Sequence, residues 1–437
     1  MSSEAIKFLY DLELFGIKLG LENIGSLCDF LGNPQNRYPC VHIAGTNGKG
    51  STAAILESIL LAAGYRVGLY TSPHLIRFNE RVRVNRQEMP ENFIDEFVGR
   101  IRPEIERLKG TFFEATTAMA FQYFAEVKAD IAVIETGLGG RLDATNIITP
   151  LVSVITNIDK DHTDRLGKSL TSIAKEKAGI IKPDVPVVIG KLKESAQKAI
   201  VEKVREVRAP LVSAPASAPV KLIKIGWKGG RYRVRESFAL EGELFLNLAG
   251  EYQGENLSVA LAVVEVLRNA GFSISAEACA TGAESVVWPA RLEMISGEPP
   301  VVLDVAHNAA AAGQLAQSLE QLWPKKAVFL LGILADKDYR RFVGQLEPLA
   351  KRFYFVRPDS MRALEPEVLA QLVKGSVQCE AILDPVEAFW KAYNSLGTGE
   401  LLVVTGSHYV VGKILESWQK LGRPYPFVAA GNKKVLY

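Results

Sequence analysis

The chain has 437 residues, of which 48% are hydrophobic, and this length suggests two or three domains with a large buried core. Lysine and arginine total 51 against 49 aspartate and glutamate, so a net charge of +2 gives no electrostatic reason to expect nucleic acid or an anionic membrane as a partner. The sequence has no apolar run of ~18 residues, no signal-peptide pattern in MSSEAIKFLYDLELFG and no CxxC pair among its four cysteines, so we expect a cytoplasmic protein with reduced thiols.

Short apolar segments alternate with helical patterns in the first half of the chain. A helix is predicted over 51–64, directly after the first apolar segment. Continuous apolar strands separated by helices are typical of a parallel sheet that is covered on both faces. The predicted strands are 38–45, 66–71, 129–136, 151–157 and 185–190.

The pattern changes after residue 209. Three prolines predict a loop over 209–220, the next residues predict a hairpin that turns at Lys228-Gly229-Gly230, and a long helix is predicted from about 251 to 269. Beyond 286–300, where we place the domain boundary, four more strands are predicted between helices: 301–307, 327–334, 352–358 and 401–407.

These elements predict an α/β protein of two domains. Residues 1–287 should form one domain with a mostly parallel sheet and a small antiparallel sheet, and residues 288–437 a second α/β domain, with a hinge at about 288–296.

The strongest motif lies between the first predicted strand and the helix that follows it. Its glycines allow backbone N–H groups to approach a phosphate, the helix N-terminus favours an anion, and Lys49 can reach the terminal phosphates. Gly50 separates Lys49 from Ser51, so the motif is not the standard GxxxxGK[ST], and a glycine-rich turn that merely caps the helix is the alternative. We call this segment the phosphate loop: Gly45, Thr46, Asn47, Gly48, Lys49, Gly50, Ser51 and Thr52.

Polar residues follow several of the other predicted strands. Ser72 in a TSPH sequence offers a hydroxyl that can ligate Mg²⁺, and Glu135 ends a buried strand at the edge where α/β proteins bind ligands. Their alternatives are an ordinary Ser-Pro turn and a capping acid. Four of the five histidines also follow predicted strands, which favours a shared cleft over solvated loop positions: His74, His162, His307 and His408.

Charged residues from three further segments complete the candidate site. Lys175 and Lys177 are two residues apart at a predicted helix end, so one of them at most can face a site, and either can be a surface charge. Asp304 closes a strand of the second domain, where it can hold ribose hydroxyls, and Arg291 lies in the segment between the domains, where its guanidinium can reach a phosphate.

Together, and in this order, the motifs GTNGKGS, TSPH, ETGLGGRLDATN, DKDH, EKAGI and DxAHN resemble the folylpolyglutamate synthase/dihydrofolate synthase branch of the Mur ligase superfamily. The resemblance runs from about residue 38 to 412. It departs from the family's pattern at Tyr252, where many members have histidine, and at Val305, where a smaller residue or proline is frequent.

The resemblance implies an ATP-dependent amide ligase that adds L-glutamate to dihydropteroate, to the glutamyl tail of tetrahydrofolate, or to both. An acyl phosphate would form and then react with the amine, leaving ADP and phosphate. The resemblance also implies that residues 1–287 form a P-loop ATPase-type, ATP-binding domain and that residues 288–437 form a Rossmann-like glutamate ligase domain. It implies a monomer with Mg²⁺ at two sites. A peptidoglycan-type Mur ligase acting on a UDP-sugar peptide is the nearest alternative, and a P-loop switch or motor is a more distant one.

The resemblance also implies roles for individual residues. It gives catalytic roles to Lys49, His162, Lys177 and Arg291. Lys177 matches the lysine that the family carbamylates. The implied Mg²⁺ ligands are Ser72, Glu135, His162 and Lys177; ATP would meet the phosphate loop and Asn256, Arg291, Asp304 and His307; the pterin side of the substrate would meet Phe112, Phe113, Glu114, Leu142, Asp143 and Ala144.

Overall fold

The computed structural model describes residues 4–12, 16, 20–375 and 377–422, which form two compact units. Of these described residues, the first unit contains those up to 220 together with 234–244 and 255–285, and the second contains 221–233, 245–254 and those from 286 to 422. The predicted domain of residues 1–287 differs from the first unit because it includes 221–233 and 245–254. In the predicted domain 288–437, residues 376 and 423–437 lie outside the described residues.

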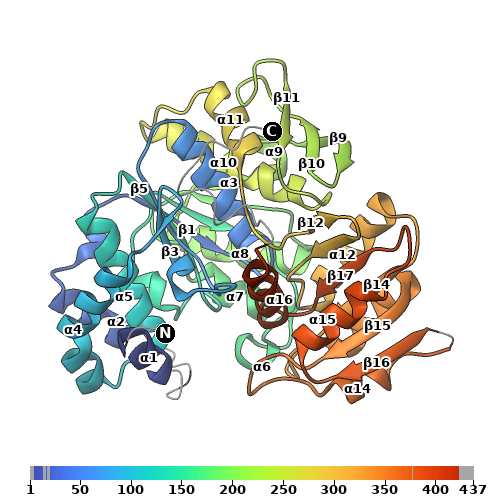
Figure 1. Ribbon diagram of the computed structural model, residues 1–437. Coiled ribbons are helices and arrows are strands. Elements are labelled where there is room, and N and C mark those ends of the chain that lie inside the picture. The colour runs from blue at the N-terminus through green and yellow to red at the C-terminus, as the bar shows by residue number, and fades with distance from the viewer. Residues whose placement is uncertain (1–3, 13–15, 17–19, 376, 423–437) are drawn as a thin grey trace. The chain divides into compact units, whose positions relative to one another are not determined.

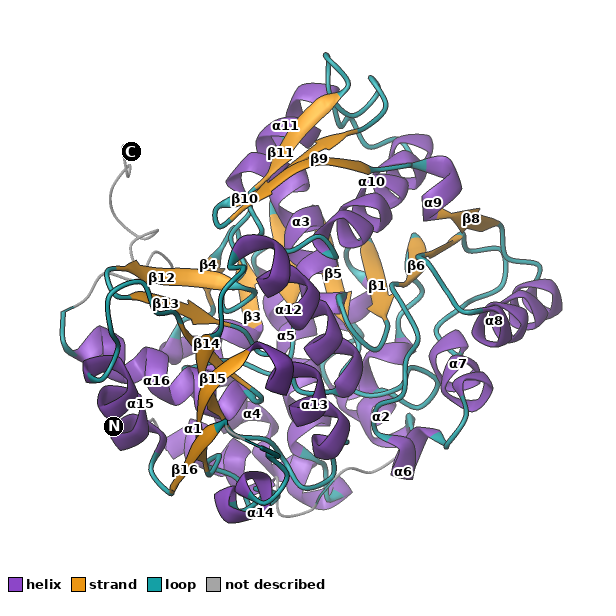
Figure 2. Cartoon of the chain, turned by 90° about the vertical axis from the view of Figure 1, so that its right-hand side faces the viewer, coloured by secondary structure: helices purple, strands orange, loops and turns teal. Residues whose placement is uncertain are grey.

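The first unit is built on an eight-stranded sheet in the order β4-β3-β2-β5-β1-β6-β7-β8. Strands β2 to β4 pair antiparallel and the other neighbours pair parallel. β1 lies between β5 and β6 (Figure 2). The strands are β1 Cys40–Ala44, β2 Val67–Tyr70, β3 Val82–Val84, β4 Gln87–Glu88, β5 Ile131–Glu135, β6 Val152–Ile155, β7 Val187–Ile189 and β8 Leu211–Ser213.

Helices cover this sheet and bury its central strands on both faces. Residues of α1, α2, α4 and α5 form one apolar core with Tyr70, Ala132 and Ile134 of the sheet, and α7 and α8 pack on Ile155 and Val187. Helix α3 contacts β1, β2 and β5 and also packs against α11. The helices are α1 Glu4–Asp11, α2 Glu22–Phe30, α3 Lys49–Ala62, α4 Glu91–Leu108, α5 Phe112–Glu126, α6 Thr163–Leu166, α7 Leu170–Ala178, α8 Glu194–Val207, α9 Ala214–Ser217, α10 Gln253–Asn269 and α11 Ala276–Ser285.

The second unit contains a six-stranded sheet in the order β12-β13-β17-β14-β15-β16, parallel except for the pair β12 and β13. Helices α12 and α13 pack on one apolar core of this sheet, while α15 and α16 lie beside β14 and β17 (Figure 1). The elements are β12 Glu293–Gly297, β13 Pro300–Leu303, α12 Ala309–Leu322, β14 Ala327–Leu331, α13 Tyr339–Leu346, β15 Ala350–Val356, α14 Pro366–Ala370, β16 Gln378–Ile382, α15 Pro385–Asn394, β17 Leu402–Thr405 and α16 His408–Lys420.

A small antiparallel sheet has the order β11-β10-β9, with β9 at Lys221–Gly226, β10 at Gly229–Arg233 and β11 at Glu243–Leu246. The predicted hairpin is present, but its turn is Trp227-Lys228, because Gly226 pairs directly with Gly229. Both glycines of the predicted turn therefore belong to β10.

One further sequence expectation is corrected, and a second segment contains a strand that the sequence does not predict. The predicted loop 209–220 contains β8, which extends the sheet by pairing parallel with β7, and the short helix α9. The predicted boundary segment 286–300 contains β12, which pairs antiparallel with β13 because a tight connection joins the two strands. Among the described residues, none of the helices has both the length and the apolar character needed to cross a membrane.

Candidate active site

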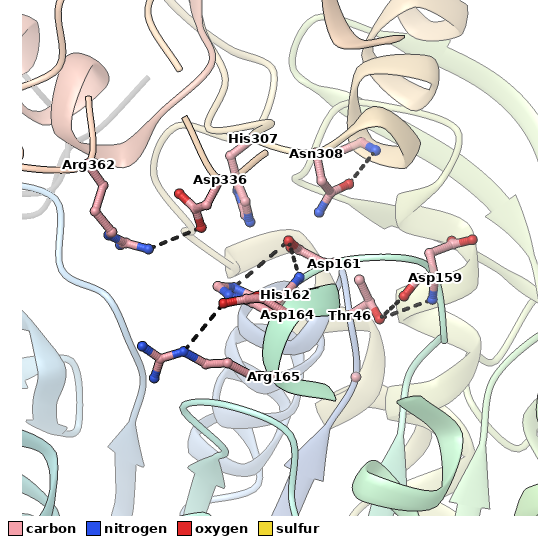
Figure 3. A network of polar contacts seen from close by, with 12 residues as sticks. Thr46, Asp159, Asp161, His162, Asp164, Arg165, His307, Asn308, Asp336 and Arg362 are labelled. Atoms are coloured by element: carbon pink, nitrogen blue, oxygen red, sulfur yellow. Dashed lines mark hydrogen bonds and ion pairs between the residues drawn. The ribbon is translucent and has the colours of Figure 1, made fainter. Parts of the chain in front are cut away.

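Residues that follow β6 hold the phosphate loop in place through hydrogen bonds. The Thr156 hydroxyl donates to the carbonyl of Asn47 at 2.7 Å, and the backbone N–H of Asn47 donates to Oδ1 of Asn157 at 2.8 Å. Oγ1 of Thr46 donates to the carbonyl of Asp159 at 3.1 Å and accepts from its backbone N–H at 3.0 Å (Figure 3). These contacts preorganise the loop's backbone for an anion.

Two glycines of the loop are required by close neighbours. A Cβ at Gly45 would lie 1.9 Å from Oγ1 of Thr156, and a Cβ at Gly48 would lie 2.2 Å from Oδ1 of Asn256. Gly48 also has a φ of +80°, in the left-handed region that favours glycine, and it caps the N-terminus of α3. The structure therefore brings Asn256 of α10 against the phosphate loop.

Glu135, at the end of β5, contacts residues that follow two neighbouring strands, β1 and β2. It ends β5, is paired in register with Ile43 of β1, and has a buried side chain. Its Oε1 lies 3.7 Å from Nζ of Lys49, and its Oε2 accepts a hydrogen bond from the backbone N–H of Ser72 at 3.4 Å. A buried carboxylate, a lysine of the phosphate loop and a serine after β2 thus meet at one edge of the sheet.

The two lysines of α7 have opposite environments. Lys177 is 4% exposed, whereas Lys175 is exposed to solvent. Nζ of Lys177 donates to the carbonyl of Gly45 at 2.8 Å, which places this amine against the first residue of the phosphate loop. Burial, with a further contribution from the nearby charge of Lys49, lowers the pKa of Lys177 to about 7. A substantial neutral fraction of this amine is therefore present at physiological pH.

His162 follows β6 in the same unit. It has a φ of +48° and caps the short helix α6. Its backbone N–H donates to Oδ1 of Asp161 at 2.9 Å, and its Nε2 lies 3.9 Å from the same oxygen (Figure 3). The imidazole is one-third exposed, so a ligand can reach it.

The residues predicted for the pterin begin helix α5. Thr111 caps this helix and forms a capping box with Glu114, whose Oε2 accepts from the backbone N–H and the hydroxyl of Thr111 at 2.7 and 2.9 Å. The ring of Phe112 stacks on Tyr10 at a centroid distance of 5.7 Å, and that of Phe113 stacks on Tyr70 at 6.0 Å. Glu114 therefore has a structural role in positioning these aromatic rings.

The second predicted pterin segment is the loop after β5. Asp143 and Ala144 are buried, and Leu142 is half-buried. The carboxylate of Asp143 accepts a hydrogen bond from the backbone N–H of Leu138 at 2.7 Å, so it closes the glycine-rich turn on itself. Burial raises the pKa of Asp143, although the hydrogen bonds oppose that shift.

The ATP residues predicted in the second unit lie close to the ends of strands β12 and β13. Asp304 follows β13, and its carboxylate accepts backbone hydrogen bonds from Leu292 at 2.9 Å and Ala306 at 2.7 Å. His307 donates from Nδ1 to the carbonyl of Val305 at 2.9 Å. Arg291 donates to the carbonyls of the two residues that precede it, at 3.3 and 3.2 Å.

Sequence reasoning missed the residues that support the phosphate loop from behind. Thr156 and Asn157 were included in a predicted strand and given no role, although two polar residues at the end of an apolar run are a signal of a ligand-facing strand end. His42 was also passed over, because it lies inside a predicted strand and not after one.

Family models and known relatives cover nearly the whole chain. The model of the Mur ligase middle domain matches residues 43–264, and that of the Mur ligase, glutamate ligase domain matches residues 290–408. The chain belongs to the Mur ligase family. It is 34% identical over 411 residues to dihydrofolate synthase/folylpolyglutamate synthase of Bacillus subtilis, with 92% of this chain and 95% of the relative covered.

Solved structures agree with this relationship. Folylpolyglutamate synthase of Mycobacterium tuberculosis, complexed with ADP and AMPPCP, matches with a TM-score of 0.85 and 31% identity over 96% of this chain and 100% of that one. Escherichia coli FolC in complex with DHPP and ADP matches with a TM-score of 0.84 and 32% identity over 96% and 99%. Within the Mur ligases, the chain belongs to the dihydrofolate synthase/folylpolyglutamate synthase group and is an acid–amino-acid ligase. The resemblance and the α/β fold class predicted from the sequence are confirmed.

Proposed function

We propose that this chain uses ATP to join L-glutamate to dihydropteroate and to the glutamyl tail of tetrahydrofolate. The observation that carries the proposal is the meeting of Lys49, Glu135 and Ser72 at one sheet edge, with Lys177 buried against the carbonyl of Gly45. The relatives named dihydrofolate synthase/folylpolyglutamate synthase support the choice of acceptor, as does the relative solved with DHPP and ADP.

A carboxylate does not react with an amine at neutral pH, because it would have to expel an oxide or hydroxide. In the proposed reaction, an oxygen of the acceptor carboxylate attacks the γ-phosphorus of ATP and ADP leaves. The amine of glutamate then attacks the acyl carbon and phosphate leaves, which completes the amide. The work of the protein is therefore to position three substrates and to neutralise negative charge.

We propose that the phosphate loop and Lys49 hold the phosphates of ATP, with Asn256, Arg291, Asp304 and His307 as further nucleotide contacts. The support in the first unit is a loop whose backbone is held by hydrogen bonds to Thr156 and Asn157, and such contacts reduce the reorganisation needed when phosphates bind. The support in the second unit is the position of Asp304 at the end of a central parallel strand.

The residues proposed as Mg²⁺ ligands fit a hard cation. In the described part of the chain, no three side chains of His, Cys, Asp or Glu gather as a metal site. The proposed set contains the Ser72 hydroxyl, the Glu135 carboxylate, the His162 imidazole and Lys177 as a carbamate, so it offers mainly oxygen donors. Bound Mg²⁺ would neutralise charge on the phosphates, at the two sites that the family resemblance implies.

We propose that Lys177 is carbamylated, because a carbamate forms on a neutral amine and burial lowers the pKa of this lysine to about 7. The modification replaces a cation by an anion with two oxygen ligands, which removes repulsion between an ammonium and Mg²⁺. An ordinary lysine that hydrogen-bonds the Gly45 carbonyl is the alternative.

The pterin side of the acceptor is proposed to meet Phe112, Phe113 and Glu114 at the start of α5 and the segment from Leu142 to Ala144. The support is that two aromatic rings lie side by side in sequence at the start of α5 and are held in place, Phe112 by stacking on Tyr10 and Phe113 by stacking on Tyr70. The expectations of a monomer and of a cytoplasmic location stay predictions.

The decisive test is ADP formation with each acceptor. Purified protein with ATP and Mg²⁺ is given dihydropteroate or tetrahydrofolate, with and without L-glutamate, and the amide product is identified by mass spectrometry. We expect turnover that requires both an acceptor and glutamate. Turnover with a UDP-sugar peptide in place of the pteroyl acceptor would support the peptidoglycan-type alternative, and turnover with no acceptor would support a nucleotide switch or motor.

A further inference from the structure

The glycine-rich loop after β5 is tied to the core of the first unit by a chain of hydrogen bonds that begins at Asp143. This carboxylate is 5% exposed. Its Oδ2 accepts from the backbone N–H of Leu138 at 2.7 Å, and its Oδ1 accepts from the backbone N–H and the hydroxyl of Thr145 at 3.1 and 2.5 Å. Since a carboxylate has about four lone-pair sites, the protein itself uses most of this capacity.

The chain continues from Thr145 into the middle of strand β1. Oγ1 of Thr145 lies 2.8 Å from Nε2 of His42, which is 103 positions earlier in the sequence and fully buried. Thr145 has one hydroxyl hydrogen, and it donates that hydrogen to Asp143. His42 must therefore donate Nε2–H to Thr145, and in its neutral form the ring then has an unprotonated Nδ1.

The surroundings of His42 favour this neutral form. Burial, helped by the charge of Lys182, lowers its pKa to about 3. Nζ of Lys182 donates to the carbonyl of Asn146 at 2.8 Å, so this cation is held close to the same loop. Within the described residues, Nδ1 of His42 has no hydrogen-bond partner.

A histidine that served only to fill the core would be a costly choice here. The other residues of β1 are Cys40, Val41, Ile43 and Ala44, so an apolar side chain would suit the same position. Burying an imidazole with one unsatisfied nitrogen costs free energy that an apolar residue would not. The single hydrogen bond to Thr145 is the feature that distinguishes His42 from such a residue.

The two ends of this chain of hydrogen bonds lie next to segments proposed to bind different substrates. His42 is three residues before Gly45, where the phosphate loop begins, and Leu138 is three residues after Glu135. The loop clamped by Asp143 contains the segment proposed to meet the pterin. The position of that loop sets where the acceptor carboxylate lies relative to the γ-phosphate that it must attack, and a small displacement there is costly for the rate.

We propose that Thr145 and His42 are positioning residues for the pteroyl acceptor: they fix the Asp143 carboxylate and, through it, the loop on which the acceptor rests. This inference deepens the proposed function and rests on it for the identity of the acceptor. Neither residue contacts the substrate; His42 acts through Thr145, and Thr145 acts through Asp143.

Matched variants of Thr145 and His42 test each hydrogen bond of this chain of hydrogen bonds. Thr145→Val removes the hydroxyl with little change of shape, whereas Thr145→Ser retains it. His42→Leu removes the donor, whereas His42→Gln keeps an N–H at a comparable distance from the backbone. The KM for dihydropteroate, the KM for ATP and kcat are measured for each variant, together with its thermal unfolding.

We expect Thr145→Val to raise the KM for dihydropteroate by about 10-fold or more, because it removes a hydrogen bond to a charged group. The KM for ATP should stay within about twofold, and Thr145→Ser should restore the wild-type value. His42→Leu should have a smaller effect on the same constant, and His42→Gln should restore it. The double variant Thr145→Val/His42→Leu should match Thr145→Val alone, because His42 acts through Thr145.

Three kinetic results would overturn the proposal: an unchanged KM for dihydropteroate in Thr145→Val, an equal rise in both KM values, or additive effects in the double variant. Amide hydrogen exchange tests the same chain of hydrogen bonds in the absence of substrate. Thr145→Val should speed amide exchange at Leu138 and Thr145 but not at Ala44 in β1. Unchanged exchange at Leu138 and Thr145 would by itself overturn the positioning role of Thr145. If Thr145→Val shows the expected faster exchange but the wild-type protein does not turn over pteroyl acceptors, the proposed function is refuted, and with it the identity of the substrate that the loop positions.

Discussion

Replacement of Lys49 by alanine should separate the contribution of this residue to catalysis from its contribution to stability. Its Nζ lies 3.7 Å from Oε1 of Glu135, a side chain with 5% exposure. Coulomb's law gives an attraction of about 1 kcal/mol at this distance in water and about 4 kcal/mol at an effective dielectric constant of 20. Because Glu135 is buried and Lys49 is partly exposed, we expect Lys49→Ala to lower the free energy of unfolding by an amount between these values.

The catalytic effect should be larger. Loss of one fixed positive group at a developing charge costs about 10²–10³-fold in kcat. The double variant Lys49→Ala/Glu135→Gln should regain most of the lost stability, since the remaining side chain is neutral, and should stay inactive. The exposed residue Lys175 provides the control, because Lys175→Ala removes the same charge elsewhere.

Two assays measure these effects. Urea unfolding gives the stability of each variant, and ADP formation with dihydropteroate and glutamate gives kcat. Near-normal turnover by Lys49→Ala would refute the assignment of the phosphate loop. Unfolding of Lys49→Ala at the wild-type urea concentration would refute the proposed attraction between Lys49 and Glu135.

Three further predictions concern other parts of the first unit. Lys177→Ala should lose most of its activity and regain part of it with added acetate, while Lys175→Ala stays active; full activity of Lys177→Ala would exclude the carbamate. Gly48→Ala should raise the KM for ATP by about 10-fold or more, because a Cβ there would lie 2.2 Å from Asn256 and φ is +80°; an unchanged KM would show that the loop tolerates the added atom. The pKa of His42 is about 3 in the folded chain against an ordinary 6.5, so the unfolded chain takes up the proton first as the pH falls. The contribution of His42 to the free energy of unfolding should therefore be fully present above about pH 6.5 and decrease by up to about 1.4 kcal/mol per pH unit below it. In urea unfolding between pH 6.5 and 4, the free energy of unfolding of His42→Gln should decrease less steeply than that of the wild type. Equal slopes would contradict the buried neutral imidazole.

The parts of the site that follow apolar strands could be predicted from the sequence. Glu135 ends an uninterrupted apolar run, and the glycines of the phosphate loop lie between a strand and a helix, so local pattern is sufficient to place both. The choice of Lys177 over Lys175 needed the EKAGI resemblance, because spacing alone shows that the two side chains diverge and not which one is buried.

The contacts that hold the site could not be predicted in this way. Thr156 supports Asn47 from a position 109 residues later in the chain, and Thr145 meets His42 across 103 residues. Such pairs depend on the strand order of the sheet, which places β1 between β5 and β6 and which hydrophobic periodicity does not specify. Strand β16 was missed for a related reason: its sequence QCEAI is partly exposed at the edge of the sheet and carries no continuous apolar pattern.

The most direct test of the account is to measure whether ATP turnover depends on a pteroyl acceptor and on glutamate together. Wild-type protein is assayed for ADP with dihydropteroate and, in parallel, with tetrahydrofolate, each with and without L-glutamate. The account predicts ADP formation with both acceptors, a stoichiometric amide product, and no turnover when either glutamate or the acceptor is left out. ATP consumption that ignores the acceptor, or an amide product with one acceptor and none with the other at saturating concentration, would contradict it.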